Sequence, residues 1–460
     1  MMRFRSVVPG VLAALTVLGA GAAAALDPRF LAVVALLAVL LIAVMFPNGR
    51  WQLAPLLVIV ISPAIFVDGA GEPLPNGDAV QKAMLLLALM CLAITAGVRW
   101  SAIGGAAVAA IGLAGLVSFL NLGGAIEVSA PLAMRALIGY ALPWLFLFID
   151  WRRVGLVRGL RFLGTLPLWS IGAGVVLQIA GVTTVLRIDE DSGVPRLQGA
   201  SIPAHLAMLS VVALFAGLCL LSMRGHGGGR RGYVWVSLNL VILIGTATRG
   251  ALVVGVVLVL AFVVHALLVN RRISRRARNA ALLLSLIGSG ALAFAAPELI
   301  RRSMGNSYEG TFNTSGRDQA WEFFSGLASQ NLYTGRGLGF STIAVEMYAP
   351  PNVQKQFVAP HNEYIHLTLD GGIFLVIALF AAMAAAIYFA ARAQRGTVRF
   401  VVIGLGAALI AWSAIDNTFS TPQFTVLILI ALGLLAAHPV PTRRAPQPDG
   451  ERVLEPAGAP

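Results

Sequence analysis

Charged side chains are scarce in this 460-residue sequence, because Asp, Glu, Lys and Arg together make up 12% of it. Soluble domains carry about 25% charged residues, and the mean hydropathy of +0.84 excludes an ordinary soluble protein. Cysteine is also rare, and Cys91 and Cys219 both lie inside apolar runs, so the sequence indicates no disulfide framework. Zinc-type Cys/His spacing, a Walker loop and a dinucleotide fingerprint are all missing, so we expect no metal and no other cofactor.

Acidic residues are fewer than basic ones, at 20 against 33, which gives a net charge of +13. A basic balance can indicate nucleic-acid binding. In a chain this apolar, it is more typical of the arginine-rich cytoplasmic loops of membrane proteins. We therefore expect contact with membrane lipid and none with nucleic acid.

Long apolar runs are what the sequence has in abundance, and fourteen of them approach the roughly 17–25 residues that a membrane-spanning helix needs. The first run follows M-M-R-F-R and has the form of a signal peptide, but an uncleaved span is favoured because further spans follow at once. The sequence predicts an all-α polytopic membrane protein with about 12–14 transmembrane helices. The runs lie near 7–26, 30–46, 51–67, 82–98, 101–120, 132–149, 162–182, 202–222, 233–247, 251–269, 279–296, 366–391, 398–415 and 423–438.

Arginine distribution sets the expected orientation. With the N-terminus in the cytoplasm, most basic residues and few acidic ones fall on the inner side, as the positive-inside rule requires. This topology places both termini in the cytoplasm. It predicts transmembrane helices 1–11 within 1–296, one large periplasmic loop at 297–365, C-terminal transmembrane helices within 366–438, and a disordered tail at 439–460.

The large loop holds most of the polar motifs. S-G-R-D-Q-A-W at 315–321 opens a predicted helix whose Trp321, Phe324 and Leu327 share one face. We expect this helix to lie flat at the membrane surface. T-G-R-G-L-G-F at 334–340 predicts a glycine-rich turn, either a flexible connection or a phosphate cradle. A-P-H-N-E-Y-I-H at 359–366 then leads into an apolar run.

Two residue types in these motifs suit chemistry on a phosphorylated substrate. Arg249 lies in T-A-T-R-G-A-L at 246–252, between two apolar runs, where an arginine is costly unless it is functional or reaches water. Arginine stays charged and binds phosphate oxygens bidentately. Histidine is the usual base near neutral pH, which makes His361 the candidate general base; an ordinary loop histidine is the alternative.

The neighbours of His361 are weaker candidates. Asn362 either positions His361 or caps the following helix, and Arg336 and Tyr364 are candidates for contacting sugar or phosphate. Glu363 is expected to be a solvated loop charge.

Four further acidic residues have competing interpretations. Asp370 follows His366 by four residues, so the two share a helical face and either pair or form a second proton relay. Asp189-Glu190-Asp191 has the Asp-x-Asp form that can hold a divalent metal on a diphosphate. Transferases that use nucleotide sugars have such a pair in the cytoplasm. This segment is predicted to lie outside the cytoplasm, where nucleotide sugars are absent, so a solvated acidic loop is favoured.

Taken in order, the motifs resemble those of the O-antigen ligase and O-antigen polymerase superfamily of bacterial membrane glycosyltransferases. T-A-T-R-G is similar to that family's Ser/Thr-Arg-Gly, S-G-R-D-Q-A-W to its S-x-R-x-x-x-W, and G-R-G-L-G-F with P-H-N-E-Y-I to its G-x-G followed by H-N-x-x-L. A weaker likeness is P-R-L-Q-G-A-S-I-P-A-H at 195–205, where Ala204-His205 replaces an expected Asn. The resemblance spans residues 195–438.

The resemblance implies a GT-C-like, metal-independent, inverting transferase in the bacterial inner membrane. Its donor would be an undecaprenyl-pyrophosphate-linked glycan, and its acceptor a hydroxyl of lipid A core or of another glycan. His361 matches the family's catalytic histidine, and Arg249 and Arg317 match its pyrophosphate-binding arginines. A protein O-oligosaccharyltransferase and a lipid-linked glycan flippase or transporter are the alternatives. The sequence does not decide the acceptor, the glycan structure or the oligomeric state.

Overall fold

The chain is almost entirely helical where its structure is described. A computed structural model describes residues 50–62, 77–120, 128–189, 193–223, 230–269, 317–350 and 359–440, with four isolated positions between 279 and 290. Within these ranges, the β structure is a two-stranded antiparallel hairpin of β1 (Leu186–Ile188) and β2 (Pro195–Leu197) and one isolated bridge between Val98 and Ile149.

Eight helices in the described ranges are long and apolar enough to cross a membrane. This confirms the prediction of an all-α polytopic membrane protein. They are α3 (Gly77–Ala96), α4 (Ala102–Phe119), α5 (Ala130–Leu145) continued by η3 (Phe146–Phe148), α6 (Leu156–Ile179), α7 (Pro203–Ser222), α9 (Arg249–Val264) continued by the π-helical η5 (His265–Val269), α14 (Glu363–Ala393) and α15 (Gly396–Ser413).

Two further apolar helices are shorter, α8 (Arg230–Gly245) and α16 (Pro422–Ala437). The three residues 246–248 separate α8 from α9, so the two predicted runs at 233–247 and 251–269 are distinct helices. They pack side by side, because a Cβ at Gly255 of α9 would lie 2.5 Å from Leu243 of α8. Small residues allow such close helix approach in a membrane.

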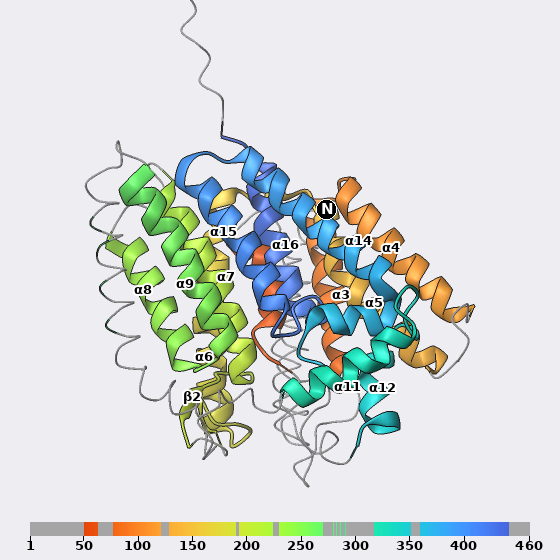
Figure 1. The fold of residues 1–460 in the computed structure, drawn as a ribbon. Helices are drawn as coiled ribbons and strands as arrows, with labels where there is room; N and C mark the ends of the chain where they lie inside the picture. Colours follow the sequence, from red (N-terminus) through yellow and green to blue (C-terminus); the bar gives the residue numbers. More distant parts are fainter. Residues whose placement is uncertain are drawn as a thin grey trace, which may run out of the picture.

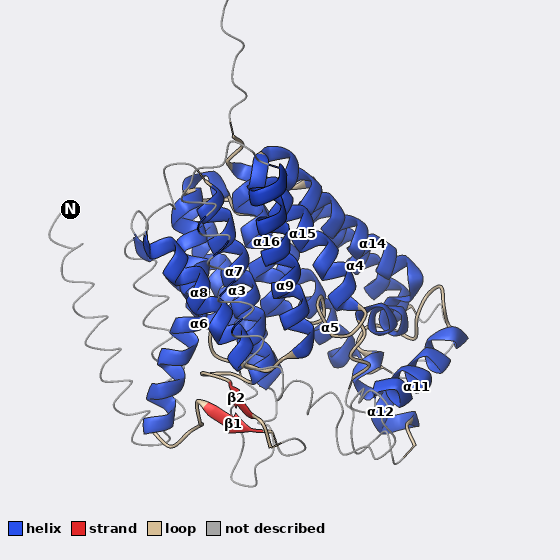
Figure 2. Ribbon diagram, turned by 60° about the vertical axis from the view of Figure 1, so that its left-hand side comes forward, coloured by secondary structure: helices blue, strands red, loops and turns tan. Residues whose placement is uncertain are grey.

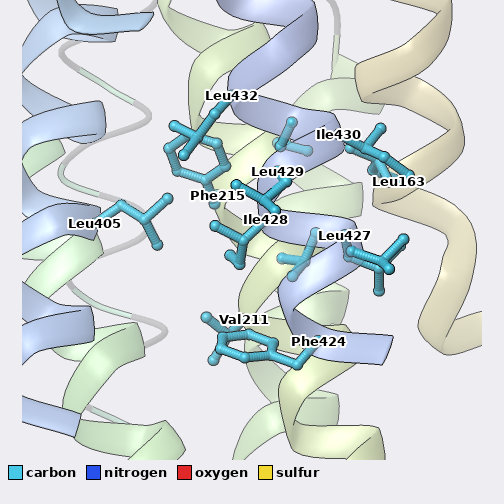
Figure 3. Close-up of a cluster of buried hydrophobic side chains, with 14 of the residues drawn as sticks. Leu163, Val211, Phe215, Leu405, Phe424, Leu427, Ile428, Leu429, Ile430 and Leu432 are labelled. Carbon is cyan, nitrogen blue, oxygen red and sulfur yellow. The ribbon is translucent and has the colours of Figure 1, made fainter. Parts of the chain in front are cut away.

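The centre of the bundle is formed by α7 and α16. Protein surrounds α7, since 89% of its apolar 18-residue stretch is buried. Phe215 of α7, Leu405 of α15 and Ile428 of α16 gather in one cluster (Figure 3), and both Phe215 and Leu405 are fully buried. Close packing in this cluster fixes where the ends of these helices lie.

The shorter elements gather at one end of the bundle, here called the loop end. Figures 1 and 2 both place the β1–β2 hairpin, α11 (Arg317–Gln330) and α12 (Phe340–Tyr348) there, and the C-terminal end of α16 lies at the opposite end. Helices α11 and α12 share a small apolar core with α14, which contains Phe324, Phe340 and Leu369. The Phe324 face of α11 is therefore buried against protein, while the expectation that this helix lies flat at the membrane surface stays a prediction.

One predicted span differs from its described part. The run at 51–67 begins as η1 (Arg50–Ile59), a ten-residue 3₁₀ helix whose Leu53, Leu56 and Ile59 are buried in the core. Pro55 inside it has no N–H to donate to an α-helical bond, which favours the tighter helix. The predicted runs at 7–26 and 30–46 lie outside the described residues. Of the tail at 439–460, only the first two residues are described, and the run at 279–296 is described at four isolated positions alone.

Candidate active site

A single loop receives contacts from three of the motifs. It comprises residues 414–421, between the end of α15 at Ser413 and the start of α16 at Pro422, and is called here the α15–α16 loop. Side chains within and beside it hold its shape: Ser413 Oγ lies 2.6 Å from Thr418 Oγ1, and Thr425 Oγ1 donates to the Thr418 carbonyl at 2.9 Å. Thr421 Oγ1 donates to the Asn417 carbonyl at 2.8 Å, so the loop is bonded across most of its length.

His361 faces this loop. Its Nδ1 lies 3.8 Å from Asp416 Oδ1, and about a third of its side chain is exposed, 34% against 17% for Asp416. The other oxygen of Asp416 accepts the Trp412 indole N–H at 3.3 Å. The imidazole is thus open to solvent or substrate while one of its nitrogens faces a carboxylate.

The backbone at His361 is strained. Its φ is +48°, in the left-handed region that costs an L-residue about 1–2 kcal/mol. Such strain persists only where the surroundings enforce it, and it is frequent at functional sites. The next residue begins the enforcement, because the Asn362 side chain accepts the Ile365 N–H at 3.2 Å and so caps α14. Of the two expectations for Asn362, helix capping is therefore the one that the structure describes.

Arg317 approaches the same loop from α11. It is the first residue of that helix, and its Nη1 donates to the Ile415 carbonyl at 2.5 Å. A guanidinium has five N–H donors, and this bond uses one of them and orients the group.

Arg249 reaches the same neighbourhood through its helix. It is the first residue of α9, and the next residue, Gly250, packs on the end of α15: a Cβ there would lie 2.7 Å from Trp412 Nε1 and 3.4 Å from Ile415 Cδ1. Glycine thus lets the start of α9 approach the residues that precede Asp416. The structure brings His361, Arg317 and the helix start that carries Arg249 to one segment, residues 412–416.

A residue that sequence analysis did not single out holds the turn before Arg249. Arg196 of β2 donates from Nε to the Thr246 carbonyl at 3.0 Å and from Nη2 to the Thr248 hydroxyl at 3.2 Å. Ala247 between them has a φ of +49°, so the bonds span a strained turn. The only signal in the sequence was the Arg in P-R-L-Q-G-A-S, which resembled the family pattern weakly.

The same arginine accounts for part of the acidic triplet. Asp189 Oδ1 lies 3.4 Å from Arg196 Nη1, and both side chains are largely buried. Asp189 is therefore not a fully solvated charge, while Glu190 and Asp191 lie outside the described residues. No group of three His, Cys, Asp or Glu within the described part of the chain has metal-binding geometry.

The environment of Glu363 differs most from what the sequence predicted. It was expected to be a solvated loop charge, but it is 0% exposed. Its carboxylate accepts the N–H groups of Phe419 and Ser420 and the Ser420 hydroxyl, all in the α15–α16 loop. The partners lie 56–57 residues away in sequence, so no local pattern could have revealed them.

The glycine-rich turn is bonded to α14 through its backbone. The N–H of Arg336 donates to the Leu369 carbonyl at 2.7 Å, and those of Gly339 and Ser341 donate to Asp370, so these backbone donors are already used. A Cβ at Gly335 would lie 2.7 Å from the Gly371 and Gly372 nitrogens. Glycine fits here because the backbone of the turn lies directly against the backbone of α14.

The part of α14 that contacts this turn contains a break in the helix. Gly372 has φ +72° and ψ −179° inside the helix, and a Cβ there would overlap the Tyr333 carbonyl oxygen. Conformations of this kind are essentially restricted to glycine. The break frees the Ile373 N–H to donate to the Leu332 carbonyl at 2.8 Å. The connection between α11 and α12 is thus bonded directly into α14.

The remaining candidates take part in packing. The guanidinium of Arg336 donates to Gln330 and lies over the Phe340 and Tyr348 rings at 5.1 and 5.3 Å. Tyr364 donates to the Ile410 carbonyl at 3.0 Å and stacks on Phe380 at 4.6 Å. The contacts of Arg336 hold it in the α11–α12 layer, and those of Tyr364 join α14 to α15.

Asp370 also has a defined place. It is 1% exposed, and its Oδ2 lies 3.8 Å from His366 Nε2. The same oxygen accepts the Tyr140 hydroxyl at 2.8 Å. His366 Nε2 lies closer to Ser341 Oγ, at 2.8 Å. The pairing expected between His366 and Asp370 is therefore one contact in a buried network that anchors α12 to α14 and α5.

Comparison with known families gives one match. Residues 232–380 match the family model described as O-antigen ligase, a stretch that includes Arg249, Arg317 and His361 but not Arg196 or Asp416. No protein of curated function matches the chain. The stretch covers less than half of the chain, and it confirms the resemblance that the motifs indicated. The chain is therefore a multi-pass membrane protein whose residues 232–380 match the O-antigen ligase family, which is of the glycosyltransferase type.

Proposed function

We propose that this protein transfers a glycan from undecaprenyl pyrophosphate to an acceptor hydroxyl at the periplasmic face of the bacterial inner membrane. The observation that carries the proposal is the meeting of His361, Arg317 and the start of α9 at residues 412–416. These groups come from three motifs that are far apart in the sequence. A base and two permanent cations are the groups that transfer from a lipid pyrophosphate needs.

In the proposed reaction, His361 takes the proton of the acceptor hydroxyl while the hydroxyl oxygen forms a bond to the anomeric carbon. The bond from that carbon to the pyrophosphate oxygen breaks, and the lipid pyrophosphate leaves with the electron pair. Attack from the face opposite the leaving group inverts the anomeric configuration. Asp416 beside Nδ1 offsets the positive charge that the imidazole gains, as a carboxylate next to a catalytic histidine does elsewhere.

Arg249 and Arg317 hold the pyrophosphate in this scheme. The leaving group carries its charge before and after transfer, so cations that bind the oxygens bidentately can stabilise the departing charge without a metal. Arg317 is oriented by its bond to Ile415, and Arg249 by the turn that Arg196 clamps. Such preorganisation is what makes electrostatic stabilisation effective.

The test is a transfer assay with purified protein in lipid nanodiscs. The donor is a synthetic undecaprenyl-pyrophosphate glycan, and the acceptors are lipid A core, a second lipid-linked glycan and a serine peptide, each with and without EDTA. We expect one acceptor to be glycosylated, with the same rate in EDTA, and mass spectrometry identifies the product. Glycosylation of the peptide would assign a protein O-oligosaccharyltransferase.

Two results would contradict the proposal. If no acceptor is glycosylated, and the donor instead crosses the bilayer of proteoliposomes that contain the protein, the chain is a flippase. If EDTA abolishes transfer and a divalent cation restores it, the two-arginine mechanism is wrong.

A further inference from the structure

Glu363 has an environment that a spectator residue would not need. It is the first residue of α14, two positions after His361, and it is 0% exposed. Burying a carboxylate costs several kcal/mol unless hydrogen bonds compensate it. Three hydrogen bonds offset part of this cost, because Oε2 accepts the Phe419 N–H at 3.0 Å and the Ser420 hydroxyl at 3.0 Å, and Oε1 accepts the Ser420 N–H at 3.1 Å.

All of these donors belong to the α15–α16 loop, which also carries Ile415 and Asp416. The bonds from Ser413 to Thr418 and from Thr421 to Asn417 join the two halves of the loop. A displacement at Ser420 would therefore move Asp416. The carboxylate of Glu363 thus connects the segment that carries His361 to the loop that faces it.

We propose that Glu363 is a positioning residue, which fixes the α15–α16 loop so that Asp416 and the Ile415 carbonyl stand against His361 and Arg317. The inference rests on the proposed function and adds a residue to that same site. Glu363 touches no substrate, because it is fully buried. It acts through the loop that it binds.

The same helix supplies a matched control. Asp370 is 1% exposed and also accepts two N–H groups and one hydroxyl, from Gly339, Ser341 and Tyr140 at 2.8–3.0 Å. Its partners belong to α12 and α5 and not to the α15–α16 loop. Losing either carboxylate removes a similar set of buried hydrogen bonds, but only one loss disturbs the loop that faces His361.

The experiment compares Glu363→Gln with Asp370→Asn in the full-length protein. In each variant, an amide N–H₂ meets donors that the carboxylate satisfied, so both should lose similar stability in thermal unfolding. In Glu363→Gln, we expect kcat per folded molecule to fall about tenfold to a hundredfold, the scale of a misplaced catalytic group. In Asp370→Asn, kcat per folded molecule should match the wild type.

A double-mutant cycle distinguishes positioning from general structural support. If Glu363 acts through Asp416, Glu363→Gln should lower kcat little further in an Asp416→Asn background, because the two changes affect one unit. Effects that multiply in full would overturn the proposal. Ser420→Ala, which removes one of the three donors, is a milder variant for the case that Glu363→Gln does not fold. It should lower kcat more than Tyr140→Phe, which removes the hydroxyl donor to Asp370.

The outcomes separate the two proposals. If the wild type transfers no glycan, the proposed function fails. If the wild type transfers, and Glu363→Gln and Asp370→Asn have equal kcat per folded molecule, the function stands and Glu363 is a structural carboxylate.

Discussion

The centre of the bundle and its loop end are held together by different contacts. At the centre, α7 and α16 pack by apolar side chains, with Phe215 and Leu429 fully buried. At the loop end, buried carboxylates bind backbone N–H groups, and glycines bring two backbones into contact. Apolar contacts have no fixed direction, whereas hydrogen bonds set distances to a few tenths of an ångström. The centre places the helices, and the loop end sets the geometry of the site.

The comparison predicts that changes at the two regions separate stability from turnover. The largest effect should come from His361→Ala at the loop end. Without the base, the transfer rate should fall about 10²–10⁴-fold, while the thermal unfolding midpoint stays close to that of the wild type. His438→Ala, at the opposite end of the bundle, is the control histidine. A His361→Ala variant with wild-type turnover would remove this residue from the mechanism.

A change at the centre should do the reverse. Leu429→Ala in α16 leaves a cavity among fully buried side chains (Figure 3) and should lower the free energy of unfolding by about 2–5 kcal/mol. Turnover per folded molecule should not change. The matched control is Leu113→Ala in α4, which is 62% exposed and should cost much less. Loss of turnover in folded Leu429→Ala protein would show that the centre also sets site geometry.

The smallest of the three effects should come from Arg317→Lys, which keeps the charge and removes the planar fork. Losing one hydrogen bond to a charged group costs about 1.5–3 kcal/mol, so kcat/KM for the lipid donor should fall about tenfold to a hundredfold. Arg392→Lys, near the far end of α14, should leave it unchanged. Equal kcat/KM in both variants would mean that Arg317 does not bind pyrophosphate.

Hydropathy predicted the spans because a membrane imposes a strong and simple constraint. Lipid offers no hydrogen-bond partner, so an apolar run must satisfy its own backbone and form a helix. The predictions at 101–120, 202–222 and 398–415 are confirmed by α4, α7 and α15. The constraint weakens where protein replaces lipid, which is why hydropathy did not reveal the buried 3₁₀ helix η1 or the buried face of α11.

The candidate site was predicted in part, for a related reason. His361, Arg249 and Arg317 stood out as residue types that suit the chemistry, and the motifs around them indicated the family. Arg196, Glu363 and Asp416 did not stand out, because what distinguishes each is a partner distant in sequence: the turn at 246–248, the loop at 419–420, and His361. A charged residue looks solvated in sequence until its partner is known.

The sequence by itself determined that this chain is an all-α membrane protein, and it supplied the candidate residues for a glycosyl transfer site. Both follow from local properties, namely hydropathy and side-chain chemistry. Tertiary structure alone decided that Glu363 is buried and that the glycines join α14 to the α11–α12 connection. It also decided that three motifs meet at residues 412–416. The physical reason is that a buried charge or a close backbone contact is stable only with its partner in place, and the chain brings those partners together only when it folds.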